Sequence, residues 1–312
     1  MRDCGAVARL IGVDVGGTKV SVALLEDTEL SAPDLRPTVT SSSEELLDQL
    51  AAAIETYLPA DAVGIGIPSV VDFASGAARS SVNIPLENVP LRHVLRERLG
   101  VPVYVDNDAT VAAVAEAYGS DGEIDVRHLV MFTVGTGIGG GIVIDGRVYR
   151  GATGAAAELG HMIIGAQLDH GAPQPQRPPQ PASLEHLASG RALDALATTR
   201  GFADGHAVVV AAQGGDTAAL DALRILGERL GIGIANVVNA LDPDVIAIGG
   251  GVSSAGALLL DPARETAEKF YLPGVGTTTE IRLARYGPRA GVLGAALMAG
   301  QEMAREQEQA AA

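Results

Sequence analysis

The chain contains two glycine-rich turns whose composition suits the binding of an anion. They span residues 14–19 (Asp-Val-Gly-Gly-Thr-Lys) and residues 135–140 (Gly-Thr-Gly-Ile-Gly-Gly). Backbone N–H groups in such a turn can converge on a phosphate, because no side chain keeps the anion away. One such turn could equally be an ordinary hairpin. Two turns of similar layout, the first with an acid before it and a lysine after it, favour a polyphosphate held from two sides.

Two other nucleotide motifs do not fit these residues. Residues 135–140 formally match G-x-G-x-x-G, but that dinucleotide motif needs a helix to begin at the turn, whereas residues 141–144 (Gly-Ile-Val-Ile) predict a strand. The P-loop pattern is absent because Lys19 follows Thr18 and not a glycine. A third glycine run, 249–251, ends an apolar strand and precedes a helix. It is either a tight turn or a platform for a nucleotide base.

A group of carboxylate and amide side chains follows another apolar strand. Asp106, Asn107 and Asp108 open a helix, where an aspartate is stabilised by free N–H groups and the helix dipole. We therefore expect one of the two aspartates to cap the helix. The other could act as a general base that takes the proton of a substrate hydroxyl during phosphoryl transfer. Asn107 could orient a neighbouring hydroxyl.

A second candidate group contains an acid and an imidazole three residues apart. Glu158 and His161 would share one face of a helical turn, where each can bind an adjacent hydroxyl of a polyol. Such a pair, taken alone, is more often a surface pair or a structural histidine. Glu185, taken alone, is an acid in the first turn of a helix.

Strands and helices alternate between these motifs, which is typical of an α/β protein. The hydrophobic patterns predict strands at 7–13, 20–24, 62–67, 101–105, 128–134, 141–144, 245–248 and 280–284. They predict helices at 43–58, 90–99, 108–118, 184–200 and 217–241, after residue 251 and at the C-terminal end. Asp145 and Gly146 predict a two-residue hairpin, and residues 165–181 an exposed loop. Strand, glycine turn and strand occur twice, as a weak internal repeat.

Composition and charge exclude several classes of protein. Hydrophobic residues make up 47% of the 312 residues and charged ones 19%, which excludes wholesale disorder. The net charge of −16 makes nucleic acid and anionic membranes poor partners. The single cysteine, Cys4, excludes an internal disulfide and a cysteine-based zinc cluster. Without an apolar span of about 18 residues or a leader, the chain is expected to be soluble and cytoplasmic.

The order and spacing of these motifs resemble the ROK family of sugar kinases and sugar-responsive repressors, and among its members the bacterial glucokinases most. The resemblance covers nearly the whole chain and includes residues 188–192 and 290–296. It implies the two-domain α/β fold of actin-like ATPases (ribonuclease H-like) with an interdomain cleft. The domains would be residues 1–118 with the helix 295–312, and residues 119–294. It also implies phosphorylation of a hexose at its 6-hydroxyl, with ATP and Mg²⁺.

The resemblance assigns roles to individual residues. Asp108 matches the catalytic base, and Asp14 lies near the metal. The matches to sugar ligands are Asn83, Asn107, Glu158, His161 and Glu185. The matches to the two phosphate loops are Asp14, Gly16, Gly17, Thr18, Lys19, Thr136 and Gly137. The matches to the adenosine platform are Gly249, Gly250 and Gly251.

Three departures from the family pattern leave alternatives open. Residues 167–182 contain no cysteine where the family has a zinc-binding C-x-C-G-x-x-x-C cluster, so we expect no structural zinc. Ser69 stands where a glycine commonly lines the sugar pocket, which allows a different or narrower substrate. The helix-turn-helix of the repressors is missing before the first strand.

The alternatives are a non-catalytic sugar sensor, a kinase for fructose, mannose or N-acetylmannosamine, and a kinase that uses polyphosphate. Two lysines offer little of the basic track that polyphosphate needs, although arginines could supply it. Because members of the family commonly self-associate, the resemblance implies a homodimer or homotetramer.

Overall fold

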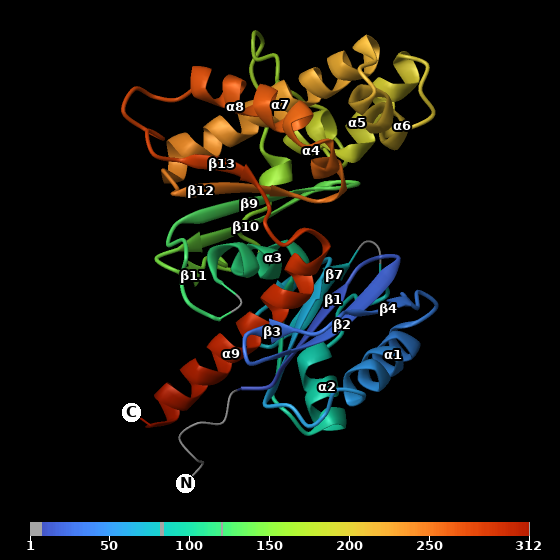
Figure 1. The fold of residues 1–312 in the computed structure, drawn as a ribbon, viewed down its shortest axis with the longest axis vertical. Coiled ribbons are helices and arrows are strands. Elements are labelled where there is room, and N and C mark those ends of the chain that lie inside the picture. Colours follow the sequence, from blue (N-terminus) through green and yellow to red (C-terminus); the bar gives the residue numbers. More distant parts are fainter. Residues whose placement is uncertain (1–7, 82–83, 120, 312) are drawn as a thin grey trace. The chain divides into compact units, whose positions relative to one another are not determined.

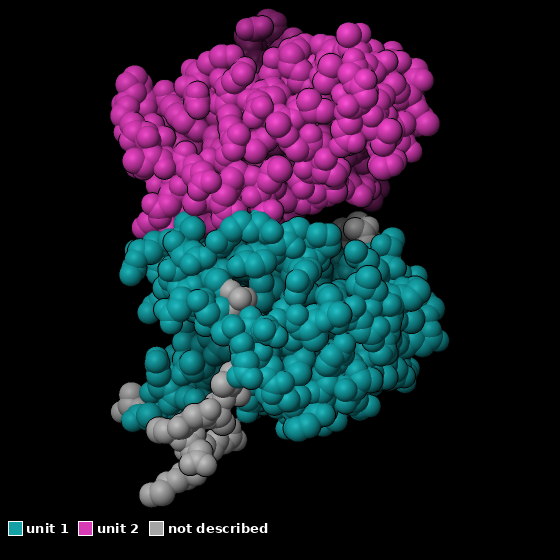
Figure 2. Space-filling model, in the orientation of Figure 1, with its two compact units in different colours: residues 1–127, 141–156, 285–312 teal, residues 128–140, 157–284 magenta. Residues whose placement is uncertain are grey.

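The computed structural model describes residues 8–81, 84–119 and 121–311, and the chain divides into two compact units (Figure 1, Figure 2). Unit 1 holds Met1–Arg127, Gly141–Ala156 and Arg285–Ala312, and unit 2 holds His128–Gly140 and Ala157–Ala284. The chain therefore passes from one unit to the other four times. Cys4 and the predicted sugar ligand Asn83 lie outside the described residues.

The sheet of unit 1 brings the ends of three parallel strands to one edge. β1 (Leu10–Val15) is parallel to β5 (Ala62–Ile67), and β5 is parallel to β8 (Val103–Asn107). β1 also pairs antiparallel with β2 (Lys19–Glu26), which carries the short strands β3 (Glu29–Leu30) and β4 (Asp34–Pro37). The register places Asp14 beside Gly66 and Gly66 beside Asp106, in a row across the sheet.

Helices cover both faces of this sheet. α1 (Ser43–Glu55) and α2 (Leu91–Leu99) bury Leu46, Leu50 and Leu95 against the β-branched residues of β1 and β5. The side chain of Ser42 caps α1, and Gly100 ends α2 in the left-handed conformation, as its position after the apolar pattern predicts. On the other face lie α3 (Asp108–Ala117) and α9 (Ala290–Ala311).

The backbone of α9 touches the backbone of its neighbours at glycines. A Cβ atom on Gly12 would lie 1.9 Å from the carbonyl oxygen of Val292, and one on Gly64 would lie 1.8 Å from that of Ala295. A Cβ atom on Gly294 of α9 would lie 1.7 Å from the carbonyl oxygen of Val111 in α3. These distances leave no room for any side chain, so the glycines set how closely α9 approaches the sheet and α3.

Unit 2 is built on the parallel strands β9 (Leu129–Val134), β12 (Val245–Gly249) and β13 (Glu280–Leu283). The strand order of the second sheet is β11-β10-β9-β12-β13, where β10 (Ile138–Ile144) starts in unit 2 and ends beside β11 (Arg147–Val148) in unit 1. The helices are α4 (Leu184–Ala188), α5 (Gly190–Thr199), α6 (Gly205–Gln213), α7 (Thr217–Leu241) and α8 (Ala257–Lys269). No helix in the described part of the chain is long and apolar enough to cross a membrane.

Most of the predicted elements form, and the Asp145-Gly146 hairpin is confirmed by positive φ angles of 52° and 70°. The single helix predicted over 184–200 is wrong, because α4 ends and α5 begins at Ser189. The side chain of Ser189 accepts the N–H of Ala192, and the next N–H, of Gly190, donates to the carbonyl of Gly135 at 2.7 Å. The prediction missed α6 and the hairpin of β6 (Ser69–Asp72) with β7 (Ala77–Ser81).

The division into units differs from the domain boundaries expected from the sequence. Residues 119–127, 141–156 and 285–294 lie in unit 1 and not in unit 2. A buried carboxylate explains part of this difference, because Glu116 of α3 accepts the backbone N–H groups of Arg285 and Tyr286 at 2.6 and 3.2 Å. Arg285 also pairs with Asp125 at 2.8 Å. The segments before and after unit 2 are thus joined to α3.

The contact between α9 and α3 predicts the effect of a single methyl group. Gly294→Ala should lower the free energy of unfolding by about 1–3 kcal/mol, because two backbones must separate. The higher helix propensity of alanine offsets about 1 kcal/mol at most. The measurement is urea unfolding of the wild type and of the variant.

Gly300→Ala in the same helix is the control, because its Cβ would meet only the flexible end of the Leu10 side chain, at 2.8 Å. Equal unfolding midpoints for the two variants would contradict the backbone contact described above.

Candidate functional site

The first glycine turn connects β1 to β2 and is closed by its own backbone. The N–H of Gly16 donates to the carbonyl of Lys19 at 2.8 Å. Thr38 supports the turn, since its hydroxyl donates to the carbonyl of Gly16 at 2.7 Å and its N–H to that of Thr18 at 3.1 Å. Gly17, Thr18 and Lys19 are exposed. The turn is therefore rigid and accessible, as an anion-binding loop must be.

Asp14 lies at the end of β1, directly before this turn. Its carboxylate fills the space beside Gly291 in the first turn of α9, where a Cβ atom would lie 2.5 Å from Cγ of Asp14. Burial raises the pKa of Asp14 to about 6, and the nearby Lys19 opposes this rise. A largely buried carboxylate whose charge is this poorly stabilised suits a bound cation. Asp14 could thus hold Mg²⁺.

Among the described residues, no group of three or more His, Cys, Asp and Glu side chains is placed to hold a metal ion by itself. A metal at Asp14 would therefore need ligands from the nucleotide and from water, which is how Mg²⁺ is usually bound in phosphotransferases.

The start of α3 is capped by Asn107, so the expectation that an aspartate caps this helix is wrong. The side chain of Asn107 accepts the N–H groups of Ala109 at 2.9 Å and Thr110 at 3.2 Å. Its amide nitrogen donates to the carbonyl of Ser69 at 3.4 Å. Asp108 is the first residue of the helix, and its Oδ1 accepts the N–H of Ala109 at 2.8 Å.

The sheet has a glycine where α3 begins. A Cβ atom on Gly66 of β5 would lie 3.4 Å from Cα of Asp108 and 2.6 Å from the side chain of Val111. Gly66 therefore lets the partly buried Asp108 lie directly on β5, the strand between β1 and β8. Unit 1 thus holds the predicted base and Asp14 at the same edge of one sheet.

Asp106, the other aspartate of the group, is buried and does not cap α3. Its Oδ2 accepts Nε of Arg150 at 2.7 Å, and its Oδ1 accepts the N–H of Asn107 at 2.9 Å. Burial raises the pKa of Asp106, and Arg150 opposes this rise.

The three predicted sugar ligands of unit 2 lie close together around the second glycine turn. Glu158 precedes the 3-10 helix η1 (Leu159–His161) and His161 is its last residue, with Nε2 of His161 3.9 Å from Oε2 of Glu158 and about half of each side chain exposed. A Cβ atom on Gly160 would lie 2.4 Å from the carbonyl of Ile138 and 3.3 Å from Cβ of Glu185. Oε2 of Glu185 accepts the N–H of Ile138 at 2.8 Å. Glu185 therefore supports the turn that carries Thr136 and Gly137.

Backbone pairing holds η1 next to residues 167–182, the stretch that contains no cysteine. Ile163 forms an isolated β-bridge with Ser183. The N–H of Leu184 donates to the carbonyl of Met162 at 2.8 Å, and the N–H of Ile164 donates to that of Ala182 at 2.9 Å. The segment that follows His161 is thus fixed to the start of α4, which also carries Glu185.

The second and third glycine turns meet at a cavity of about 250 Å³ within unit 2. Gly250 has a φ of 86°, and a Cβ atom there would lie 2.4 Å from the carbonyl of Val134. The lining comprises Gly135, Thr136, Gly190, Leu193, Asp194, Gly205, His206, Val209, Gly251, Val252 and Ser254. Its size and glycine-rich entrance fit a nucleoside next to a phosphate loop.

Of the site residues predicted from the sequence, Thr136 and Gly251 are the two that line this cavity. Gly190 lies in the 188–192 motif, which the resemblance had singled out without assigning a role. Asp194 and His206 come from α5 and α6, where Oδ1 of Asp194 accepts the N–H of Gly205 at 2.8 Å. The Asp204 cap of α6 was the signal that could have located this helix and its residues.

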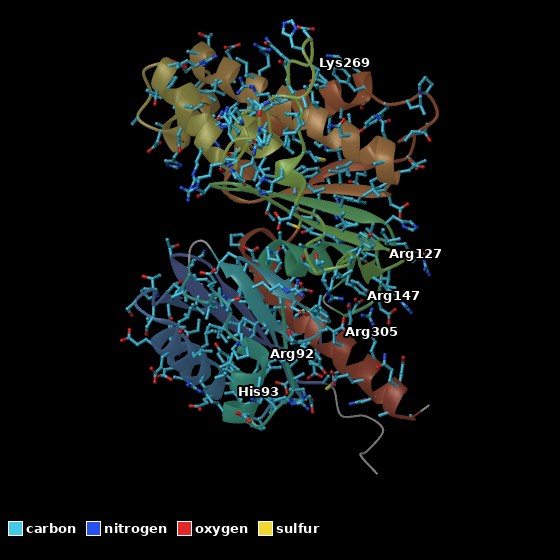
Figure 3. All side chains as sticks on the ribbon, turned by 180° about the vertical axis from the view of Figure 1, so that it is seen from behind. Arg92, His93, Arg127, Arg147, Lys269 and Arg305 are labelled. Atoms are coloured by element: carbon cyan, nitrogen blue, oxygen red, sulfur yellow. The ribbon has the colours of Figure 1, made fainter. Side chains whose placement is uncertain are left out.

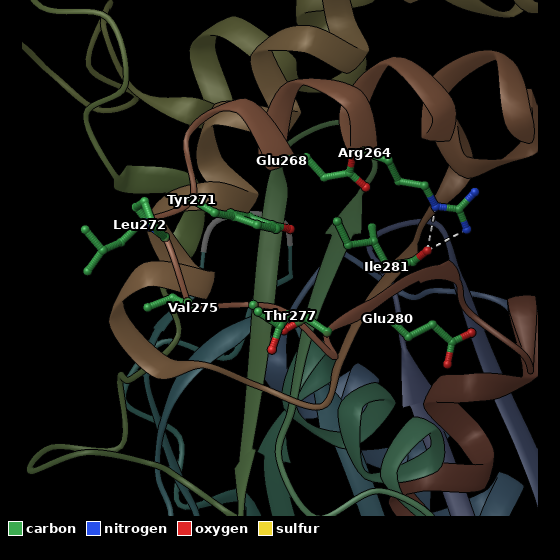
Figure 4. Close-up of a pocket in the computed structure, with 12 residues that line it drawn as sticks. Arg264, Glu268, Tyr271, Leu272, Val275, Thr277, Glu280 and Ile281 are labelled. Atoms are coloured by element: carbon green, nitrogen blue, oxygen red, sulfur yellow. Dashed lines mark hydrogen bonds between the residues drawn. The ribbon is translucent and has the colours of Figure 1, made fainter.

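A wider cavity of about 700 Å³ lies between α8, β13 and the loop that joins them (Figure 4). Arg264 there donates to the carbonyl of Ile281 at 2.7 Å. None of the predicted site residues lines this cavity. Lys269 ends α8 (Figure 3), whereas the other lysine, Lys19, begins β2 at the first glycine turn.

Comparisons with known proteins agree with these features. A sequence model described as the ROK family matches residues 10–302. A glucokinase of Halalkalibacterium halodurans is 33% identical over 322 residues, which cover 94% of this chain and 95% of that protein.

Two crystal structures are similar over both units. A ROK family glucokinase from Streptomyces griseus, in complex with glucose and AMPPNP, has a TM-score of 0.77 and 31% identity, covering 94% of this chain and 99% of that one. A ROK hexokinase from Thermus thermophilus has a TM-score of 0.77 and 33% identity, covering 95% and 99%. The predicted fold class, the α/β fold of actin-like ATPases, is confirmed.

The raised pKa of Asp14 predicts a pH-dependent cost to folding. The carboxyl keeps its proton up to about pH 6 when folded but only to about pH 3.9 when unfolded. The stability that comes from the protonated carboxyl of Asp14 is therefore fully present below about pH 4, and it is lost as the pH rises through 6. Asp14→Asn cannot ionise, so its stability relative to the wild type should rise by about 2–3 kcal/mol between pH 4 and pH 7.

Urea unfolding of the wild type and of the variant at pH 4, 5, 6 and 7 measures this difference. Asp169→Asn, in an exposed loop, is the control and should follow the wild type at every pH. Parallel pH curves for Asp14→Asn and the wild type would disprove the raised pKa.

Proposed function

The chain belongs to the ROK family, and on this premise we propose that it transfers the γ-phosphate of ATP to the 6-hydroxyl of a hexose, with glucose as the preferred substrate. The observation that carries the proposal is the start of α3. There Asn107 caps the helix and presents Asp108 at the edge of the sheet that also holds Asp14. The structural likeness to a glucokinase in complex with glucose and AMPPNP supports it.

Asp108 acts as the general base. The hydrogen bond that the N–H of Ala109 donates to Oδ1 holds the carboxylate in one orientation. The carboxylate takes the proton of the 6-hydroxyl as the oxygen of that hydroxyl bonds to the γ-phosphorus and the bond from this phosphorus to the bridging oxygen breaks, so that ADP leaves. Because phosphoryl transfer requires little covalent help from the protein, orientation of the hydroxyl is the main contribution of this residue.

The remaining hydroxyls of the sugar bind to side chains of both acceptor and donor type. Asn107 uses its oxygen as the helix cap, so it donates to the sugar through its amide nitrogen. Glu158 and His161 offer an acceptor and a donor on adjacent, half-exposed side chains. Glu185 binds through the carboxylate oxygen that does not hold Ile138, and Asn83 remains a proposed ligand outside the described residues.

The nucleoside of ATP occupies the cavity lined by Gly251 of the third glycine turn and by Thr136 of the second. Thr136 and Gly137 in unit 2, and Gly16–Lys19 in unit 1, remain the proposed phosphate-binding residues. Asp14 would hold Mg²⁺, which when bound would supply positive charge beside the phosphate oxygens, where negative charge develops. Asp14 orients this ion, and Lys19 offers the phosphates a cation at the exposed end of the first turn.

The same premise extends to the setting of the reaction. The protein works in the cytoplasm as a homodimer or homotetramer, with ATP and Mg²⁺ and without nucleic acid or membrane partners. Size-exclusion chromatography with light scattering measures the assembly.

Asp108→Asn tests the proposed base. The amide keeps the shape of the side chain but takes no proton, so kcat should fall by about 10²–10⁴ while KM for glucose stays within a few-fold. A coupled assay of ADP release with glucose, mannose, fructose and N-acetylmannosamine measures this.

Asp169→Asn again serves as the matched control. Unchanged turnover in Asp108→Asn would reject the assignment of the base. A wild type that binds sugars but turns over none of them would instead be a sugar sensor.

Gly251→Leu tests the nucleotide cavity. Gly251 lines the cavity, and a Cβ atom there meets nothing within 4 Å, so the larger side chain fits at the cavity without disturbing the fold. KM for ATP should rise about tenfold or more, whereas KM for glucose should not change. Val210→Leu, on the exposed side of α6, is the control. Normal ATP affinity in Gly251→Leu would place the nucleoside elsewhere.

A further inference from the structure

Asp106 and Arg150 form a buried ion pair next to the start of α3, the helix that carries the proposed base Asp108. Asp106 is 2% exposed, and Arg150 donates to its Oδ2 through Nε at 2.7 Å. The other carboxylate oxygen of Asp106 accepts the N–H of Asn107 at 2.9 Å. The carboxylate is therefore fixed from both sides, and one of its bonds orients the peptide that precedes Asp108.

Arg150 is itself held by several elements of unit 1. Its guanidinium lies 3.5 Å from the centre of the Phe73 ring, which Arg92 approaches at 5.2 Å (Figure 3 labels Arg92). It also pairs with Glu302 of α9 at 3.3 Å. Arg92 donates to the carbonyl of Phe73 at 2.8 Å and so fixes the ring from its backbone. The position of Arg150 is thus set by rigid neighbours.

Arg150 also begins the segment that leads to the proposed sugar ligands. Its carbonyl accepts the N–H of Ala156 at 3.1 Å, which closes residues 150–156 into a loop. A Cβ atom on Gly154 would lie 2.3 Å from the carbonyl of Val71 in β6, so the loop lies against that strand. The chain enters unit 2 immediately afterwards, one residue before Glu158. Arg150 therefore helps to fix two segments of the chain, the one that precedes Asp108 and the one that precedes Glu158.

Stability alone is a weak reason for such a pair. Replacing a buried ion pair by apolar side chains of similar volume is often neutral or favourable, whereas removing one partner leaves an uncompensated charge. What an apolar pair cannot supply is an acceptor for the directed hydrogen bond that the N–H of Asn107 donates to Asp106. We propose that Arg150 and Asp106 are positioning residues that set Asp108 for proton transfer and Glu158 for sugar binding. This inference rests on the proposed kinase function.

The two roles predict a specific kinetic pattern. Displacing Asp108 by a fraction of an ångström lowers kcat, and loosening the segment before Glu158 raises KM for the hexose. The residues that line the cavity proposed for the nucleoside all belong to unit 2, and the first glycine turn is held by Thr38 and by its own backbone, so KM for ATP should change less than KM for glucose. A pair that only stabilised the fold would lower the amount of active protein and leave both constants of the folded enzyme as they are.

The experiment compares Arg150→Lys, Arg150→Met and the double variant Asp106→Asn/Arg150→Met with the wild type. Turnover of glucose and ATP is expressed per ADP-binding site, which counts folded molecules only. Arg150→Met should lower kcat about 10- to 100-fold, raise KM for glucose about threefold or more and leave KM for ATP within about twofold. Arg150→Lys keeps the charge but loses the planar guanidinium, so its kcat and its KM for glucose should lie between those of the wild type and those of Arg150→Met.

The double variant separates positioning from stability, because it removes the uncompensated charge and the bond to Arg150, while the new amide can still accept the N–H of Asn107 but is no longer held from its other side. It should recover the melting temperature that Arg150→Met loses, but not its kcat. Arg305→Met, which removes another arginine bound to Glu302 at 2.7 Å, is the control and should keep wild-type kinetics. Recovery of kcat together with the melting temperature, or normal constants in Arg150→Met, would overturn the inference. A wild type without turnover of any hexose would overturn the proposed function and this inference with it.

Discussion

The close approach of α9 to β1, β5 and α3 is the constraint on which unit 1 depends. Backbone atoms of four elements come into contact at Gly12, Gly64 and Gly294, where a single methyl group does not fit. The same helix begins beside the carboxylate of Asp14 and reaches Arg150 through Glu302. The relative positions of Asp14 and Asp108 are therefore set by main-chain contacts, which vary less than contacts between flexible side chains.

Local sequence signals predicted the elements well where local forces decide. The two glycine turns, the positive φ angles at Asp145 and Gly146, and the end of α2 at Gly100 all follow from backbone sterics that the residue types reveal. The break at Ser189 does not, because it depends on a hydrogen bond to Gly135, more than fifty residues away. Likewise Asp106, Asn107 and Asp108 are each plausible caps. Only the salt bridge of Asp106 to Arg150 shows which of them faces the interior.

The site residues show the same limit. Motif order identified Glu158, His161 and Glu185 as a set, yet it could not show that Glu185 holds the turn at Ile138. The missing cysteines of 167–182 were plain in the sequence, but the backbone bridge of Ile163 with Ser183 that secures this region was not. Asp194 and His206 were missed because the cavity proposed for the nucleoside is assembled from α5 and α6 together with turns at Gly135 and Gly251 that are far from them in the chain.

The four passages of the chain between the units have a consequence for synthesis on the ribosome. All of unit 2 precedes residue 285, so its sheet and helices can form while translation continues. Unit 1 cannot, since α9 is translated after everything that it covers. Until that helix emerges, one face of β1 and β5 stays open to water, and a nascent-chain chaperone has a defined apolar surface to protect.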